Sequence, residues 1–262
     1  MEALIRFIKD HVRSAGASGV VIGISGGLDS AVVADLCVRA LGADAVHGFL
    51  MPSEDSNPQD AADGRLLLEH LGLPVHERPI EPVLAGMETV LGRFDSPQQR
   101  GNVKARARMM ILYAEAQARG CLVAGTGNKS ELLIGYFTKH GDGGNDLLPI
   151  GDIYKSDLFD LARELGLPAQ LIEKPPSAGL WEGQTDEGEL GMTYPQLDAI
   201  LKGIELNSNP DDIASRTGQS LSEVNRICGL VRSSEHKRKL ALIPKMGART
   251  VGIDWRRSVH WD

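Results

Sequence analysis

One stretch of the sequence, residues 19–35, constrains the fold more than any other. It begins with the β-branched apolar run Val20 to Ile24, which is typical of a strand buried on both faces of a parallel sheet. After the next turn, apolar residues recur at helical spacing up to Leu41, and Gly42 marks the helix end. The turn itself reads Ser25-Gly26-Gly27-Leu28-Asp29-Ser30. A glycine-rich turn between a strand and a helix N-terminus predicts a site for an anionic ligand.

The class of anion loop follows from its spacing. No Gly-Lys-Ser/Thr follows, so the turn is not a Walker A loop, and it lacks the GxGxxG pattern of dinucleotide-dependent hydride transfer. The hexapeptide resembles the SGGxDS pyrophosphate loop of the N-type ATP pyrophosphatases. The alternative is an ordinary βα turn that needs only glycine and an Asp or Ser cap.

Strand-like and helical patterns alternate along the first 165 residues. A helix is expected over 1–15, strands over 20–24, 45–51, 74–80 and 121–125, and helices over 31–41, 59–71, 81–91, 101–119 and 155–165. This alternation predicts an α/β fold, a doubly wound parallel sheet with helices on both faces. Helical patterns over 194–202, 210–216 and 220–239 predict a helical C-terminal part, and we expect a single domain over 1–262.

Composition excludes several classes of partner. The 262 residues carry a net charge of -7, which argues against a nucleic-acid or membrane-surface binder. No apolar run approaches the length of a membrane span. Cys37, Cys121 and Cys228 form no metal-binding spacing and are expected to be buried apolar residues in a reducing cytoplasm.

The helix expected at 101–119 carries cations at its start, including Lys104, Arg106 and Arg108. Because cations oppose the dipole at a helix N-terminus, they are either solvated or face something negative. The run Met109 to Tyr113 is apolar on too many sides for a surface helix. It therefore belongs either to the core or to a subunit interface.

Two further segments are rich in glycine. Residues 126–146 follow the strand at 121–125, at the end of the sheet where open α/β folds bind ligands, and the part with four glycines from Gly135 to Gly144 reads as a flexible loop. Residues 179–191 are glycine-rich and acidic, which fits either a mobile lid or a plain surface linker.

Five motifs in order resemble the ammonia-dependent NAD synthetases over nearly the whole chain. They are SGGLDS at Ser25, NVKARARM at Asn102, GTGNKSELLIGYFTKHGDGGND at Gly125, KPPSAGLWEGQTDE at Lys174 and HKR at His236. The resemblance implies that the nicotinate carboxylate of deamido-NAD attacks the α-phosphate of ATP. It also implies that ammonia then converts the NAD-adenylate to NAD and AMP.

The resemblance assigns roles to the nucleotide side of the site. It places ATP on Gly23, Ile24, Ser25, Gly26, Gly27, Leu28, Asp29, Ser30, Thr126, Lys155 and Ser177. Asp29 and Glu131 are implied Mg²⁺ ligands, and Asp29 and Lys155 are implied catalytic residues. From the residues alone, each has an alternative role. Asp29 could equally be a helix cap, Glu131 a carboxylate in the first turn of a helix, and Lys155 a solvated lysine near a helix start. Ser177 replaces a threonine of some relatives and keeps its hydroxyl.

The resemblance also assigns the second substrate and the partners. It implies that deamido-NAD binds Arg106, Lys139, Asp146, His236 and Lys237, and that the helix at 101–119 joins a homodimer. No additional glutamine-hydrolysing domain is expected, so free ammonia is the expected nitrogen donor. The chain departs from many relatives after Arg238, where a proline-rich finish is absent.

Three other readings compete with this one. A GMP synthetase core shares the SGGxDS loop but lacks the GYFTKHGDGG segment. A tRNA-thiolating enzyme is expected to carry catalytic cysteines or a basic RNA-binding surface. A non-catalytic ATP sensor needs no second substrate site, so Glu131, Lys139 and Asp146 argue against it.

Overall fold

The computed structural model describes residues 1–177, 179, 183–239, 241–251 and 254. The strands are β1 (Val20–Gly23), β2 (Val46–Leu50), β3 (His76–Glu77) and β4 (Leu122–Ala124). The helices are α1 (Glu2–Ser14), α2 (Leu28–Leu41), α3 (Pro58–His70), α4 (Glu81–Leu91), α5 (Pro97–Arg119), α6 (Lys129–Ile134), α7 (Lys155–Leu165), α8 (Ala169–Ile172), α9 (Asp186–Leu190), α10 (Tyr194–Glu205), α11 (Pro210–Thr217) and α12 (Leu221–Ser233). Two 3-10 turns are η1 (Ala43–Ala45) and η2 (Glu235–Lys237).

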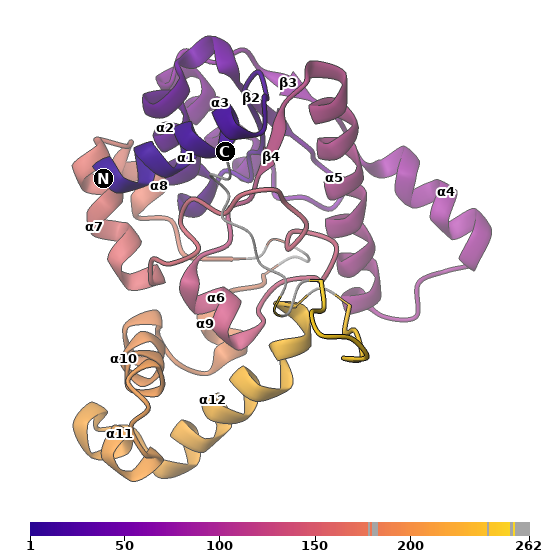
Figure 1. The fold of residues 1–262 in the computed structure, drawn as a ribbon. Coiled ribbons are helices and arrows are strands. Elements are labelled where there is room, and N and C mark those ends of the chain that lie inside the picture. Colours follow the sequence, from indigo (N-terminus) through magenta and orange to yellow (C-terminus); the bar gives the residue numbers. More distant parts are fainter. Residues whose placement is uncertain (178, 180–182, 240, 252–253, 255–262) are drawn as a thin grey trace.

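The four strands form one parallel sheet in the order β3-β2-β1-β4. Val20 of β1 pairs with Val46 of β2 on one side and with Leu122 of β4 on the other. The strand order reverses between β1 and β4, and open α/β sheets bind ligands at such a switch point. The predicted doubly wound fold is confirmed (Figure 1).

Side-chain alternation in β1 divides the core between the two faces of the sheet. Val20 and Ile22 pack with α1, α2, α3 and α7, whereas Val21 between them packs with α4 and α5. Because successive side chains in a strand point to opposite faces, a four-residue buried strand supports two helical layers at once. This explains why the run at Val20 is apolar without interruption.

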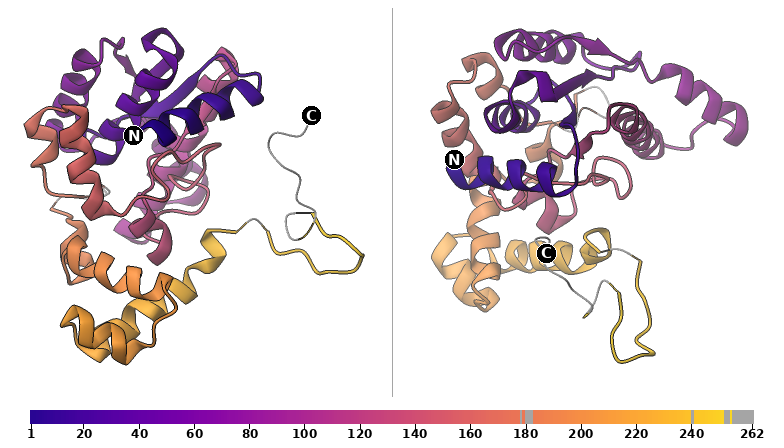
Figure 2. Two further views of the ribbon diagram at one scale, coloured as in Figure 1. Left: turned by 60° about the vertical axis from the view of Figure 1, so that its left-hand side comes forward. Right: turned by 45° about the horizontal axis from the view of Figure 1, so that its top comes forward.

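The C-terminal helices build a second apolar cluster. Tyr194, Leu197 and Ile200 of α10 pack with residues of α11 and α12, and Ile134 of α6 and Tyr154 join this cluster to the sheet. Figures 1 and 2 show α10, α11 and α12 as a group at the end of the molecule nearest α6. The predicted helical C-terminal part is therefore confirmed.

Several element boundaries differ from the prediction. The helix α5 begins at Pro97, where Ser96 accepts a hydrogen bond from the Gln99 amide, and not at Gly101. The strand β3 has only two residues, because just Phe49 and Leu50 of β2 pair with it. The short helix α6 was not among the expected helices, and its C-cap is Gly135, where the expected flexible loop begins.

The last long helix also ends earlier than expected. Ser220 caps α12 by accepting a hydrogen bond from the Glu223 amide, and the Glu223 side chain pairs with Arg226. The helix stops at Ser233, and the basic residues that follow lie in η2 and beyond.

Two expectations from composition can be compared with the fold. Cys37 is buried, and burial raises the pKa of its thiol, whereas Cys121 and Cys228 are half-buried. None of the helices in the described ranges has the length and apolar character needed to cross a membrane.

Candidate active site

The predicted anion loop connects β1 to α2 at the switch point of the sheet. Gly26 has a φ of +75°, and a Cβ there would lie 2.1 Å from the carbonyl oxygen of Asp60, so only glycine fits. The Ser30 hydroxyl accepts a hydrogen bond from the Ser25 amide at 3.3 Å, and the Ser25 hydroxyl accepts one from Gly27 at 3.2 Å. Two amides of the loop therefore donate to serine oxygens, and such amides at a helix N-terminus are the groups that bind phosphate.

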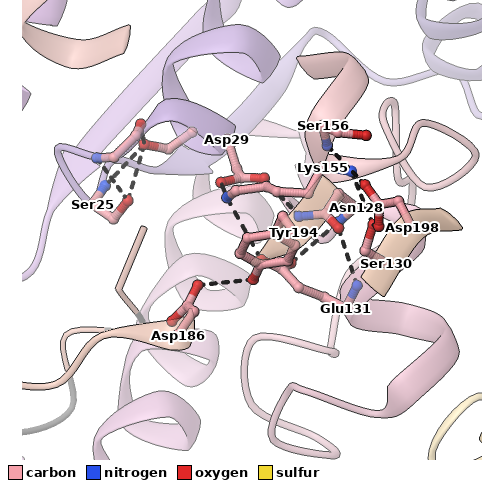
Figure 3. Close-up of polar contacts among 12 residues, drawn as sticks. Ser25, Asp29, Asn128, Ser130, Glu131, Lys155, Ser156, Asp186, Tyr194 and Asp198 are labelled. Atoms are coloured by element: carbon pink, nitrogen blue, oxygen red, sulfur yellow. Dashed lines mark hydrogen bonds and ion pairs between the residues drawn. The ribbon is translucent and has the colours of Figure 1, made fainter. Parts of the chain in front are cut away.

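Asp29 lies in the first turn of α2, and its two oxygens have different partners. Asn128 donates a hydrogen bond to Oδ1 at 2.8 Å, and Lys155 forms an ion pair with Oδ2 (Figure 3). The backbone of Gly27 is the N-cap of α2, without a side-chain cap. The alternative that Asp29 is a helix cap is therefore wrong.

Glu131 has a structural role and also faces the site. Its carboxylate accepts a hydrogen bond from the Asn128 amide at 3.3 Å, and Asn128 caps the Glu131 amide, which together form a capping box at the start of α6. Its other oxygen lies 3.8 Å from Nζ of Lys155. Burial, followed by the charge of Asp29, raises the pKa of Glu131 to about 8.

This raised pKa gives the first prediction. In the absence of metal, Glu131 stabilises the fold in its protonated form, so the free energy of unfolding falls as the pH rises from about 4.5 to about 8. Glu131→Gln keeps the capping oxygen and removes the titration. Urea unfolding in a chelator over this pH range is expected to give a flatter profile for the variant. An unchanged slope would mean that Glu131 is ionised throughout.

Lys155 is held between the two carboxylates. Its side chain is 4% exposed, so the alternative of a solvated lysine is wrong. Burial lowers the pKa of Lys155, but Asp29 and Glu131 outweigh this effect and leave it raised. The ammonium lies 5.5 Å from the centre of the Tyr194 ring, which is itself buried. Lys155 is therefore a charged, fixed cation beside the anion loop.

Two residues that the sequence analysis did not select hold α7, and with it Lys155, in place. The Lys155 amide donates to the Ser130 hydroxyl at 2.9 Å, and Asp198 of α10 accepts hydrogen bonds from that hydroxyl and from the Ser156 amide. Ser130 lies within the Asn-x-x-Glu pattern of Asn128 and Glu131, which is a readable capping signal for the start of a helix. Asp198 comes from a distant helix and had no local signal.

The donor set fits Mg²⁺. Asp29 and Glu131 offer oxygens on either side of one ammonium, and carboxylate oxygens are hard ligands that Mg²⁺ prefers. Within the described residues, no group of three or more His, Cys, Asp or Glu side chains is arranged to hold a metal. Mg²⁺ commonly takes one or two carboxylates and completes its shell with phosphates and water.

Four predicted substrate residues converge near the C-terminal end of α6. Arg106 of α5 donates to the carbonyl of Lys139 at 3.3 Å, and Lys139 donates to the carbonyl of His236 at 2.7 Å. Lys237 donates to the carbonyls of Gly135 and Phe137, both at 2.8 Å. Three distant segments thus meet and bring their cations together.

Asp146 contacts α5 and β4. Its carboxylate accepts hydrogen bonds from the Val123 amide at 2.8 Å and the Tyr113 hydroxyl at 3.1 Å. Burial and the Asp146 charge raise the pKa of Tyr113 to about 12, so the phenol remains a donor at neutral pH. Among the described residues, no hydrogen bond joins the Asp146 side chain to Arg106, Lys139, His236 or Lys237.

The remaining predicted residues lie at the edges of the loop. Thr126 directly follows β4 and its neighbour Gly125. Ser177 donates to the carbonyl of Gln184 at 2.7 Å, which ties the residues just before the expected lid at 179–191 to its middle. Its last part forms α9, whereas residues 180–182 of the expected lid lie outside the described residues.

Comparison with known proteins identifies the family. The sequence model of the family described as NAD synthase matches residues 1–241. The chain belongs to the NAD synthase family. An NH(3)-dependent NAD(+) synthetase of Methanocaldococcus jannaschii is 45% identical over 247 residues, covering 93% of this chain and 95% of the relative. One from Chlorobaculum tepidum is 41% identical over 259 residues, covering 98% of this chain and 93% of the relative.

Solved structures of the NAD synthase type share the fold. The structure of an NH3-dependent NAD synthetase from Campylobacter jejuni superposes with a TM-score of 0.78 at 33% identity, covering 93% of this chain and 96% of that chain. The structure of an NMN synthetase from Francisella tularensis gives a TM-score of 0.83 at 38% identity with the same coverage. Sequence and fold therefore agree on the family.

Proposed function

We propose that this protein is an ammonia-dependent ligase that makes NAD from deamido-NAD and ATP. The observation that carries the proposal is the pair Asp29 and Glu131 around Lys155, placed directly beside the Ser25 to Ser30 loop. A nucleotide sensor has no need for buried charges at the phosphate end of the loop. Family membership supports the same reaction.

The first step transfers the adenylyl group. A nicotinate carboxylate oxygen attacks the α-phosphorus of ATP, the bond between the α-phosphorus and its bridging oxygen breaks, and pyrophosphate leaves. The amides of the Ser25 to Ser30 loop receive the pyrophosphate, and Lys155 stabilises its charge. Asp29 and Glu131 would hold Mg²⁺, which supplies positive charge for the phosphates when bound.

The second step forms the amide. The nitrogen of ammonia attacks the acyl carbon of the adenylate, the acyl–oxygen bond breaks, AMP leaves and the nitrogen loses a proton to solvent. The carboxylate and ammonia are both nucleophiles, so no side chain has to act as a general base. The contribution of the protein is positioning and charge stabilisation.

Pyrophosphate release tests the proposal directly. The purified protein with ATP and Mg²⁺ is expected to release pyrophosphate only when deamido-NAD is present. Because a Francisella NMN synthetase is a structural neighbour, nicotinate mononucleotide is the second acid to test. Faster release with the mononucleotide would keep the ligase chemistry and replace the proposed substrate. Release with neither acid would contradict the proposal.

Arg106 provides a test of the second substrate site. Arg106 is exposed on α5 beside Lys139, where its charge is available to an anionic ligand. Arg106→Ala is expected to weaken the binding of deamido-NAD about tenfold, which is the effect of losing one charge-assisted hydrogen bond. The affinity for ATP is expected to stay within about twofold of the wild-type value. Arg163→Ala on α7, where Arg163 pairs only with the exposed Asp160, is the control. Equal losses for both substrates would contradict this placement.

We further propose a homodimer through α4 and α5. Val90 of α4 is 78% exposed and Met110 of α5 is 52% exposed, and α4 extends away from the rest of the molecule in Figure 1. Light scattering at micromolar concentration is expected to give a molar mass twice that of one chain. Met110→Glu is expected to shift the measured molar mass toward that of a single chain. A wild-type protein of single mass would exclude the dimer.

A further inference from the structure

One carboxylate beside the candidate active site lacks a full set of partners. Asp186, the first residue of α9, is 3% exposed. Its Oδ2 accepts a hydrogen bond from the Tyr194 hydroxyl at 2.9 Å. Its Oδ1 is buried and has no hydrogen-bond partner among the residues that the structure describes. A buried carboxylate oxygen without a donor is costly, so this atom needs an explanation.

Asp186 lies near enough to Asp29 and Lys155 for their charges to act on it. Tyr194, to which it is bonded, is 1% exposed and lies under the Lys155 ammonium. Figure 3 shows Asp186 and Lys155 on either side of the Tyr194 ring. The charge of Lys155 lowers the pKa of Asp186 and the charge of Asp29 raises it, although burial is the largest influence and leaves it raised. Lys155 forms ion pairs with Asp29 and Glu131, and Asp186 is a third acidic group near this lysine.

The backbone fixes Asp186 in this position. Its amide donates to the carbonyl of Pro176 at 3.1 Å, and the Thr185 hydroxyl caps α9 through the Gly188 amide. The Ser177 hydroxyl holds the carbonyl of Gln184 at 2.7 Å. These bonds close the ends of the 177–184 segment on each other and fix the start of α9.

We propose that Asp186 is a positioning residue for hydrated Mg²⁺, whose unpaired oxygen accepts a hydrogen bond from a metal-bound water. Mg²⁺ keeps several waters when one or two carboxylates bind it, and such waters need acceptors. The inference rests on the Mg²⁺ site proposed for Asp29 and Glu131, and it links α9 to that metal.

The test compares Asp186→Asn with Glu189→Gln. Asparagine keeps an acceptor for Tyr194 and places an NH₂ donor where Oδ1 was. Glu189 lies on the same short helix, and its carboxylate pairs with Tyr136 and Gln184, so its substitution is the matched control. Mn²⁺ binding in the presence of ATP, without an acid substrate, is followed by electron paramagnetic resonance. We expect Asp186→Asn to weaken Mn²⁺ about tenfold or more and Glu189→Gln to leave it unchanged.

The melting temperature without metal separates positioning from a structural role. Removing an unpaired buried charge relieves a cost, so Asp186→Asn is expected to melt at the same temperature or higher in a chelator. A lower metal-free melting temperature, a variant that does not fold, or unchanged Mn²⁺ affinity would each overturn the proposal. If Asp29→Asn and Glu131→Gln also leave Mn²⁺ binding unchanged, the metal placement fails as well, which is a different result from failure of Asp186 alone.

Discussion

Asp29→Asn is expected to reduce pyrophosphate release in the presence of ATP, Mg²⁺ and deamido-NAD by about 10³-fold. The substitution removes the carboxylate that forms an ion pair with Lys155, and with it one oxygen of the proposed metal site. Asparagine retains the shape of the side chain and an acceptor for Asn128, so the fold of the loop is preserved. Quenched-flow measurement of pyrophosphate isolates this step from the later amidation.

Asp35→Asn is the matched control for this variant. Asp35 is also a carboxylate of α2, is 4% exposed and forms an ion pair with Arg39. We expect Asp35→Asn to lower the melting temperature and leave adenylation at the wild-type rate in the folded fraction. Wild-type pyrophosphate release by Asp29→Asn at saturating Mg²⁺ and ATP would contradict the role of Asp29.

Lys155→Met is expected to affect both stability and rate. It leaves Asp29 and Glu131, which are 18% and 17% exposed, without their shared cation. Breaking a buried ion pair from one side typically costs about 3–5 kcal/mol, and loss of a charge at the phosphates costs about 10²-fold or more in rate. Urea unfolding in a chelator and pyrophosphate release measure the two effects separately.

Lys202→Met is the control for Lys155→Met. Lys202 also lies over an aromatic ring, 4.9 Å from the centre of Tyr154, but its ion pair with Asp157 is exposed. An exposed pair of this kind contributes less than about 1 kcal/mol, so little change in stability or rate is expected. Similar losses for both variants would show that burial of Lys155 has no special energetic role.

The central part of the site was predictable because its signals are local. The β-branched strand, the glycines and the helix that begins at Leu28 are adjacent in the chain, and Gly26 is explained by backbone contacts alone. The position of Glu131 opposite Asp29 followed from two parallel strands that end at the same edge. The structure confirms the proximity, because β1 and β4 are hydrogen-bonded neighbours.

The parts that could not be predicted depend on contacts between distant segments. Lys104 was expected to be solvated or to face something negative, and it is 1% exposed and pairs with Asp55 of this chain. The basic residues that follow α12 were expected to lie at the C-terminal end of their own helix, where cations are favourable. Arg238 instead donates to the carbonyls of Leu132 and Leu133 at the C-terminal end of α6.

Helix boundaries show where local signals were present but competed with others. Ser96 followed by Pro97 is a helix start signal, yet the charged residues after it favoured a loop in the sequence analysis. The six residues of α6 are too few to show a helical period between glycines, although Asn128 and Glu131 form a capping box. Packing against the C-terminal helices stabilises this short helix.

The most direct test of the account is NAD formation by the purified protein with ATP, Mg²⁺ and deamido-NAD, comparing ammonium with glutamine. The account predicts NAD, AMP and pyrophosphate in equal amounts with ammonium, and no NAD with glutamine. NAD formed equally well from glutamine would contradict ammonia as the donor. Pyrophosphate release without NAD in the presence of ammonium would contradict the ligase reaction with deamido-NAD.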